Sequence, residues 1–202
     1  MNAVALLWMV DAHAVADADL PRLRESLSAG EQARCQRFVR AERLRQFVIG
    51  RVLARMALER VLGVPAREVV LEEQVASAPL LVAPVVPGVA PGFSISHSGR
   101  WVACAVSAAT ALGLDIEMRD ATRDLAALAQ QAFDADEVRQ WEALPATRRV
   151  DGFYRMWSTK EARFKLGREG HSITIAHDAL SVVVCSAAPL ATPPVIELVA
   201  LP

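Results

Sequence analysis

Two acidic side chains lie two positions apart in residues 112–117 (LGLDIE). Successive side chains of an extended strand point to opposite faces, so Asp115 and Glu117 share one face, ~6.5 Å apart along the strand. Carboxylates at that distance repel each other, so a proton or a cation should join them. A hard divalent ion, Mg²⁺ or Mn²⁺, is the natural partner of such oxygen ligands. Taken alone, the pair favours an amphipathic strand with an exposed acidic face over a metal site.

The segment 153–165 (FYRMWSTKEARFK) contains both lysines of a chain whose other basic residues are all arginine. Glu161 and Lys165 are helical neighbours, and as a structural ion pair they contribute only about 0.3–0.5 kcal/mol. As chemistry, Glu161 is a candidate third carboxylate for the cation. Lys165 is a candidate to carry charge or a proton at a phosphate, whereas an arginine, always protonated, carries only charge.

The same segment has aromatic residues at helical spacing. At about 100° per residue, Phe153, Trp157 and Phe164 share one face, which predicts a core-facing stripe. Lys160 lies near that face, so its ammonium group must extend to water or find an acidic partner.

Small polar side chains gather before a predicted turn at residues 98–100. Ser96 and His97 end a predicted strand over residues 93–97 (FSISH), where hydroxyl, imidazole and backbone amides could bind phosphate oxygens. A structural histidine in a hairpin is the alternative for His97. The sequence has no G-x-x-x-x-G-K-[ST] loop and no G-x-S-x-G elbow, which excludes those two classes of enzyme site.

The elements that position these residues alternate between strand and helix. Ser28-x-x-Glu31 resembles a capping box, which begins a helix, and Gly63 is a signal that ends one. We therefore predict one helix from the capping box to about Leu62. Leu44, Val48, Val52 and Met56 form its predicted core stripe. Further helices are predicted over 122–143 and 150–167, strands over 3–10, 93–97, 101–107 and 112–117, one or two strands within 179–199, and an irregular connection over 77–92.

Composition and charge narrow the class of protein. The 202 residues are 53% hydrophobic with a net charge of −1, which excludes disorder and a surface coated in positive charge for nucleic acid. Charge is nevertheless uneven, because residues 22–60 carry an excess of arginine and residues 115–142 an excess of acid. One half therefore suits anions and the other a cation, although each charge alone also fits a solvated helix face.

The cysteines and apolar runs indicate a compartment. Cys35, Cys104 and Cys185 are odd in number and form no C-x-x-C pair, so we expect buried thiols and a cytoplasmic protein. No apolar run is long enough for a membrane span, so no membrane partner is expected.

Three segments in order, FSISHSGRWVACAVS, LGLDIE and FYRMWSTKEARFK, resemble the 4′-phosphopantetheinyl transferases of the Sfp-like type. The firm match covers residues 93–170, and the arginine-rich stretch 43–55 adds a looser one. The spacing of D-x-E before W-x-x-K-E-x-x-x-K is specific, although each motif alone is not.

The resemblance implies an α+β fold built as a pseudodimer in one chain. Its two similar halves, 1–106 with a basic coenzyme A-binding helix and 107–202 with the magnesium carboxylates, would each pair a small antiparallel sheet with a long helix. The active site would lie at their interface. Two halves in one chain also predict a monomer.

The resemblance further implies a reaction. Such enzymes transfer the 4′-phosphopantetheine arm of coenzyme A to a serine of an apo acyl or peptidyl carrier protein and release adenosine 3′,5′-bisphosphate. Carried over by motif, Asp115, Glu117 and Glu161 would hold Mg²⁺, with Mn²⁺ as a substitute. Glu161 would be the base for the serine proton, with Glu137 as the second candidate, and Lys165 would stabilise or protonate the departing phosphate.

The coenzyme A positions follow in the same way. Ser96, His97 and Lys165 match phosphate-binding positions, and Arg45 and Arg51 match basic positions of the early helix. Many relatives have a Gly-Lys-Pro segment where this chain has Ser77-Ala78-Pro79, so that lysine contact is absent or supplied by an arginine.

Two other functions use the same residues. A magnesium-dependent phosphohydrolase of a nucleotide-like diphosphate would need a positioned water instead of a protein serine. A non-catalytic module that binds a carrier protein or coenzyme A would not need the complete set of carboxylates and lysine that this chain has.

Overall fold

A computed structural model describes residues 3–74, 78–85 and 91–202. The fold is α+β, with small sheets and helices, as predicted. Its strands are β1 (Leu6–Asp11), β2 (Val70–Glu72), β3 (Leu80–Ala83), β4 (Gly92–Ser98), β5 (Trp101–Ser107), β6 (Leu112–Met118), β7 (His171–Ile175), β8 (Leu180–Ser186) and β9 (Ile196–Leu198). Its α-helices are α1 (Leu20–Glu25), α2 (Ala29–Cys35), α3 (Ala41–Leu62), α4 (Leu125–Ala132), α5 (Ala135–Glu142) and α6 (Ala146–Leu166).

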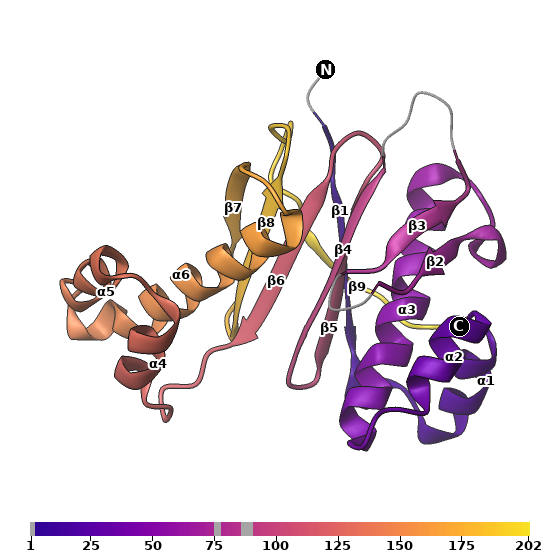
Figure 1. The fold of residues 1–202 in the computed structure, drawn as a ribbon, viewed down its shortest axis with the longest axis horizontal. Coiled ribbons are helices and arrows are strands. Elements are labelled where there is room, and N and C mark those ends of the chain that lie inside the picture. Colours follow the sequence, from indigo (N-terminus) through magenta and orange to yellow (C-terminus); the bar gives the residue numbers. More distant parts are fainter. Residues whose placement is uncertain (1–2, 75–77, 86–90) are drawn as a thin grey trace.

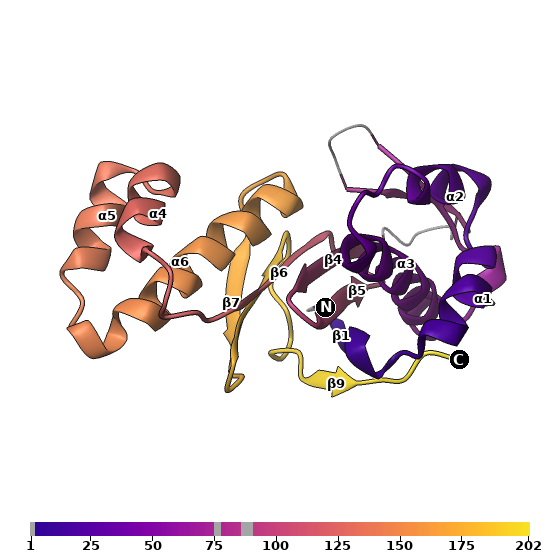
Figure 2. The ribbon, with the colours of Figure 1, turned by 90° about the horizontal axis from the view of Figure 1, so that it is seen from below.

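Two sheets lie between two long helices (Figures 1 and 2). One sheet has the order β4-β5-β1-β9 and carries α3 on its outer face, and the other has the order β6-β8-β7 and carries α6. The strands β2 and β3 form a separate pair beside α3 (Figure 1). Helices α4 and α5 pack at the start of α6, away from α3 (Figure 2).

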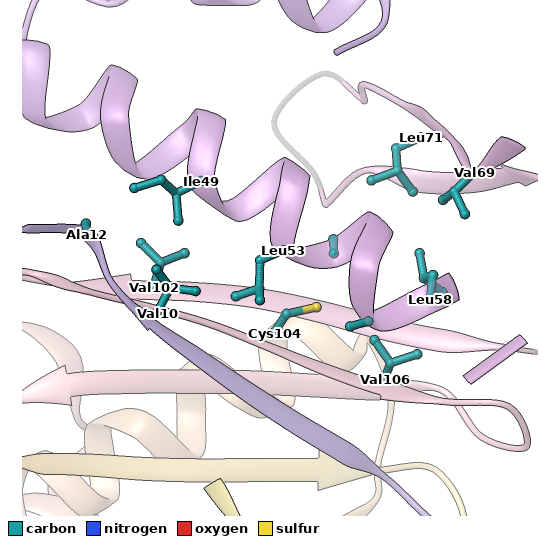
Figure 3. Packing of buried hydrophobic residues seen from close by; sticks show 12 residues of the cluster. Val10, Ala12, Ile49, Leu53, Leu58, Val69, Leu71, Val102, Cys104 and Val106 are labelled. Carbon is teal, nitrogen blue, oxygen red and sulfur yellow. The ribbon is translucent and has the colours of Figure 1, made fainter. Parts of the chain in front are cut away.

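The first core lies between α3 and the first sheet (Figure 3). Ile49 and Leu53 of α3 meet Val10 of β1 and Val102 and Val106 of β5. All five side chains are buried, and the strand residues share one face because they alternate along their strands. The predicted stripe from Leu44 to Met56 faces elsewhere and packs against α1 and α2.

The second core lies between the two sheets. Leu7 and Met9 of β1 point away from α3 and contact a face formed by Leu114 and Ile116 of β6 and by Val182 of β8, among others. The other face of β6, which carries Asp115, is therefore turned toward α6. The period-two prediction for residues 112–117 is confirmed.

Serine side chains join the two sheets at their edge. Ser94, Ser96 and Ser98 alternate along β4, and their hydroxyls accept hydrogen bonds from the backbone amides of Leu114, Ile116 and Met118 at 2.9, 3.2 and 2.9 Å. These side chains take the place of a backbone ladder between β4 and β6. They fix β6 in register beside β4.

The single helix predicted from the Ser28 capping box to about Leu62 has the correct start and end, but the structure divides it into α2 and α3. The Ser28–Glu31 capping box forms, and the helix ends at Gly63, whose φ is 69°. The chain breaks between α2 and α3, where Phe38 turns back to pack against Phe47 with ring centroids 5.2 Å apart. A contact between two single aromatic residues leaves no periodic signal in the sequence.

The other predicted helices and strands mostly agree with the structure in kind, but the structure has more of them than predicted. The turn at Gly99, with φ 53°, joins β4 to β5 as expected. The pattern over 122–143 is two helices, because Asp134 caps a new one. The predicted irregular connection contains β3, and its positions 77 and 86–90 lie outside the described residues. Strand β7 is absent from the prediction, since its residues are mostly polar or exposed.

The aromatic stripe of α6 is wrong at one position. Phe153 is buried among Phe133, Trp141 and Tyr154, but Phe164 is 79% exposed. The reason is that α6 changes partner along its length, from α4 and α5 to the sheet, where Ala162 and Leu166 form the contact. A prediction that assumes one core-facing side along the whole of α6 does not include that change of partner.

The cysteine prediction is confirmed, because all three thiols are free and buried. Burial raises the pKa of Cys104 to about 12, so this thiol is unreactive. Among the helices of the described residues, none has the length and apolar character to span a bilayer.

Candidate active site

An ion pair joins the two sequence motifs. Lys165 Nζ of α6 lies 2.9 Å from Asp115 Oδ1 of β6, and it also donates to Ser96 Oγ at 3.1 Å and to the Leu114 carbonyl at 3.0 Å. Asp115 is only 4% exposed. Residues from β4, β6 and α6, far apart in sequence, therefore meet at one point.

A glycine allows this approach. Gly113 faces α6, and a Cβ atom there would lie 1.9 Å from the Ala162 carbonyl oxygen. Only a residue without a side chain lets α6 pack so closely on β6. Gly113 thereby places the last turn of α6, with Lys165, over Asp115.

The two strand carboxylates lie in a setting suited to a cation. Asp115 Oδ2 is buried and has no hydrogen-bond partner among the described residues, while Glu117 accepts from Ser98 Oγ at 2.8 Å. Burial raises the pKa of Glu117, and the charge of Asp115 raises it further. A cation would satisfy the orphaned oxygen and offset both unfavourable effects, so these residues fit a divalent metal.

Glu161 lies on α6 one turn before Lys165 and is half-buried. In the part of the chain that is described, no three histidine, cysteine, aspartate or glutamate side chains are gathered closely enough to hold a metal by themselves. The structure thus brings Asp115 and Lys165 together, with Glu117 on the same strand face, and does not gather Glu161 into a three-carboxylate group.

Glu137 has a different environment. Its carboxylate caps the start of α5 by accepting from the Asp134 amide, and Lys160 Nζ lies 2.6 Å from the same oxygen. Glu137 is therefore the acidic partner expected for Lys160 from the sequence. Glu137 is engaged with α5 and Lys160.

A cavity of about 280 Å³ adjoins Lys165. One face of α3 forms a wall, because residues at helical spacing line it, and β4 contributes the opposite side. The lining includes basic side chains beside apolar ones: Arg34, Arg43, Arg51, His97, Lys165, Phe38, Phe47, Phe93, Ile95 and Pro79. A cavity that is cationic and partly aromatic suits a ligand with both phosphates and an apolar ring.

His97 faces this cavity in its neutral form. Arg43 donates to His97 Nδ1 at 3.0 Å, which a neutral imidazole can accept. Burial and then the charges of Arg43 and Lys165 lower the pKa of His97 to about 4. His97 is thus available as a hydrogen-bonding group and not as a cation.

Arg45, expected to bind coenzyme A, is not among the residues that line this cavity. It donates to the carbonyls of Ala12 and Val15 at 2.9 and 2.7 Å and pairs with Asp17, which ties the N-terminal segment to α3. Arg43 lines the cavity instead. Positions 43 and 45 are about 200° apart around a helix, so they cannot share its face.

Arg51 does line the cavity, but its charge is already paired. Its side chain is 7% exposed, and Nε and Nη2 lie 2.9 and 2.6 Å from Glu73 Oε1. The sequence motifs do not identify Arg34, Arg43 or Glu73 of this region. Arg43 could have been identified from its spacing to Arg51, because the two residues are two steps of four apart along the helix.

The arrangement can bind a phosphorylated ligand and polarise it. Basic groups line the cavity, Lys165 stands at its edge, and the Asp115–Glu117 face lies directly behind that lysine. Such a site suits phosphoryl chemistry, in which positioned cations neutralise charge on the transferred group.

Two family models match consecutive parts of the chain. Residues 15–109 match "4′-phosphopantetheinyl transferase, N-terminal", and residues 111–190 match "4′-phosphopantetheinyl transferase superfamily". The division between the two matches falls between β5 and β6.

Curated relatives give the same result. A 4′-phosphopantetheinyl transferase of Bacillus subtilis is 32% identical over 162 residues, 80% of this chain and 68% of the relative. HetI of a Nostoc species is 32% identical over 76% of this chain and 65% of its own length. Sfp of Bacillus subtilis is 30% identical over 80% of this chain and 68% of its own length, so the chain spans about two thirds of each relative.

Proposed function

The chain belongs to the 4′-phosphopantetheinyl transferase superfamily, of the Sfp-like type, and on that basis we propose the details of its reaction. It transfers the 4′-phosphopantetheine arm of coenzyme A to a serine of an apo acyl or peptidyl carrier protein. The serine oxygen forms a bond to the phosphorus of the arm as the diphosphate P–O bond breaks. Adenosine 3′,5′-bisphosphate leaves, and the serine proton passes to a base.

The contact between Asp115 and Lys165 at the edge of a basic cavity is the observation that carries this proposal. A diphosphate bound in the cavity would end beside this buried carboxylate and this ammonium group, which supports the proposal. Asp115 is part of the D-x-E motif, and Lys165 is part of the K-E-x-x-x-K motif.

Asp115, Glu117 and Glu161 would hold Mg²⁺, for which Mn²⁺ could substitute. The orphaned Oδ2 of Asp115 supports the first of these assignments. When bound, the ion neutralises charge on phosphate oxygens and on the leaving group. For Glu161 to join the set, its carboxylate must reach the β6 face from one turn away on α6.

Lys165 holds a proton at Nζ and donates it, as a hydrogen bond or by transfer, to an oxygen of the departing phosphate. Glu161 takes the proton of the carrier serine, directly or through a water. Glu137 is the second candidate base, but its carboxylate must first leave Lys160 and the α5 cap.

The cavity would bind the nucleotide part of coenzyme A. We assign Ser96, His97 and Lys165 to phosphate contacts, as the motifs imply, and Arg43 to the role expected of Arg45. Arg51 contributes through its side chain in the cavity wall. Arg34 and Arg43 supply positive charge in place of the lysine that is absent before Pro79.

The site would lie between two halves of a pseudodimer, residues 1–106 and 107–202, in a monomeric protein. Lys165 of the second half faces a cavity whose other walls come from the first, which supports this assignment. The second half contributes one strand to the first sheet, because β9 pairs in parallel with β1. Three free thiols fit a reaction that takes place in the cytoplasm.

Mass spectrometry of a panel of apo carrier proteins tests the proposal. After incubation with coenzyme A and Mg²⁺, we expect a gain of ~340 Da on the serine nucleophile of at least one carrier. Omitting the metal should abolish the gain. Release of adenosine 3′,5′-bisphosphate without any carrier, and no mass gain on any carrier, would instead indicate a phosphohydrolase and contradict the transfer reaction.

A further inference from the structure

Two arginines of the cavity wall share one internal counter-ion. Glu73, which follows β2, pairs with Arg51 through Oε1 at 2.6 and 2.9 Å and with Arg34 through Oε2. The Glu73 side chain is 17% exposed, so these contacts are partly desolvated. The positive charge at this part of the cavity is therefore reduced before any ligand binds.

The arginines are held in place independently of Glu73. Both contact the ring of Phe47 of α3, with the guanidinium carbon of Arg51 4.7 Å and that of Arg34 5.3 Å from its centroid. Arg51 also lies 3.4 Å from Glu31. Cation–π contacts of this kind orient the guanidinium groups. The pair would stay positioned if the Glu73 carboxylate moved away.

Glu31 and Glu73 differ in how firmly they are held. Glu31 is fully buried, caps α2 and accepts from Arg55 at 2.6 and 3.1 Å, so it is a fixed part of the core. Within the described part of the chain, the Glu73 carboxylate pairs with Arg34 and Arg51 and caps no helix. Glu73 is therefore the carboxylate that can leave.

A second cavity beside Glu73 could receive its side chain if the carboxylate left Arg34 and Arg51. This cavity of about 580 Å³ is lined by Glu73, Arg37 and Gln74, and it shares Arg34 and Phe38 with the first cavity. Arg37 is exposed at its wall and offers an alternative partner to the displaced carboxylate.

We propose that Arg34 and Arg51 form an anion subsite that Glu73 occupies in the free protein, so that Glu73 limits the affinity for the phosphorylated donor. A phosphate group carries more negative charge than a carboxylate and has three acceptor oxygens, so it can replace Glu73 on both guanidinium groups. Each binding event must then displace an internal anion, which weakens binding. This inference rests on the proposed function, because it takes coenzyme A as the ligand.

Direct binding of coenzyme A to the full chain, measured by calorimetry without a carrier protein, tests the inference. Glu73→Gln keeps the shape of the side chain and removes its charge, so the Kd for coenzyme A should fall at least about fivefold, as expected when charged hydrogen-bonding partners are released. Glu72→Gln, at the neighbouring exposed position of β2, is the matched control and should bind as the wild type does. An unchanged or raised Kd for a folded Glu73→Gln variant overturns the inference.

A second variant identifies the arginine involved. Adding Arg34→Gln to Glu73→Gln should cancel most of the gain in affinity, whereas an undiminished gain would exclude Arg34 from the subsite. If Glu73→Gln does not fold, Glu73→Asp takes its place: its shorter side chain cannot span both arginines, and it should bind coenzyme A more tightly than the wild type. A Kd at or above the wild-type value would contradict the inference.

The two proposals fail separately. A wild-type chain that modifies carriers, with a Glu73→Gln variant that binds no more tightly, rejects only the role of Glu73. A wild-type chain that neither binds coenzyme A nor modifies any carrier rejects the proposed function.

Discussion

The two lysines of this arginine-rich chain have different environments, although they lie on one helix. Lys165 contacts Asp115, Ser96 and a β6 carbonyl at the cavity edge, whereas Lys160 pairs with Glu137 near α5. Of the two lysines, Lys165 lines the cavity that we propose binds phosphate. The choice of lysine at position 165 is explained if the ammonium group gives up a proton, which a guanidinium group cannot do.

Lys165→Arg tests that explanation. The variant keeps the charge, so the KM for coenzyme A should change little, while the kcat for carrier modification should fall at least about tenfold because the acid is lost. Lys160→Arg is the matched control and should keep a normal kcat. Equal kcat values for Lys165→Arg and the wild type would reduce Lys165 to a purely electrostatic role.

His97 makes the stability of the fold depend on pH. Its pKa is lowered to about 4 in the folded protein, because of burial and the adjacent cations, from 6.5 for an exposed histidine. The unfolded chain therefore binds more protons between these values, so the free energy of unfolding should decrease as pH falls from 6.5 toward 4, by up to about 1.4 kcal/mol per pH unit.

Urea unfolding at several pH values measures this effect. His97→Asn should have a flatter dependence on pH than the wild type in that window, and His171→Asn, at an exposed position of β7, should keep the wild-type slope. Parallel curves for His97→Asn and the wild type would show that His97 is not the group responsible.

At the scale of elements, the site depends on how closely α6 packs on β6. Gly113→Ala would place a methyl group against the Ala162 carbonyl, so α6 must shift or the strand must bend. We expect a loss of about 2 kcal/mol or more in the free energy of unfolding, because the clash is with backbone. Lys165 would also move from Asp115, and the rate of transfer should fall.

Gly30→Ala is the control, because a Cβ atom there meets no atom of residues 3–74, 78–85 or 91–202 within 4 Å and the residue is helical. It should raise the urea midpoint slightly, because alanine is about 0.5–1 kcal/mol more favourable than glycine within a helix, and it should leave the rate unchanged. A Gly113→Ala variant as stable and active as the Gly30→Ala variant would mean that α6 is not fixed by this contact.

Features of the fold that depend on residues close together in the sequence are predicted correctly. The Ser28–Glu31 cap, the Gly99 turn and the alternation through Asp115 depend on a few neighbouring residues, and each is present. The position of Arg45 depends on which face of α3 meets the cavity, and the exposure of Phe164 depends on where α6 changes partner. Both are set by tertiary packing, which residue spacing does not encode.

At the scale of the whole molecule, two helices enclose two sheets, and the candidate site lies where the sheets meet. The serine bonds from β4 to β6 and the hydrogen bond from Lys165 of α6 to Ser96 of β4 cross that junction. Through a family resemblance, the D-x-E and K-E-x-x-x-K motifs predict a site at the interface of two halves, and this stays a prediction. The internal pairing of Arg34, Arg51 and Glu73 could not be predicted, because Glu73 belongs to no motif and comes close only through the β2–β3 segment.

The rate of mass gain on a carrier protein, compared between the wild type and Asp115→Ala, tests the central claim most directly. Loss of the buried carboxylate should lower the rate at least about a hundredfold, because the cation loses a ligand and Lys165 its partner. Asp178→Ala, at an exposed position, should retain the wild-type rate, and circular dichroism should show that both variants are folded. A folded Asp115→Ala variant that modifies the carrier at the wild-type rate would contradict the assignment of this site.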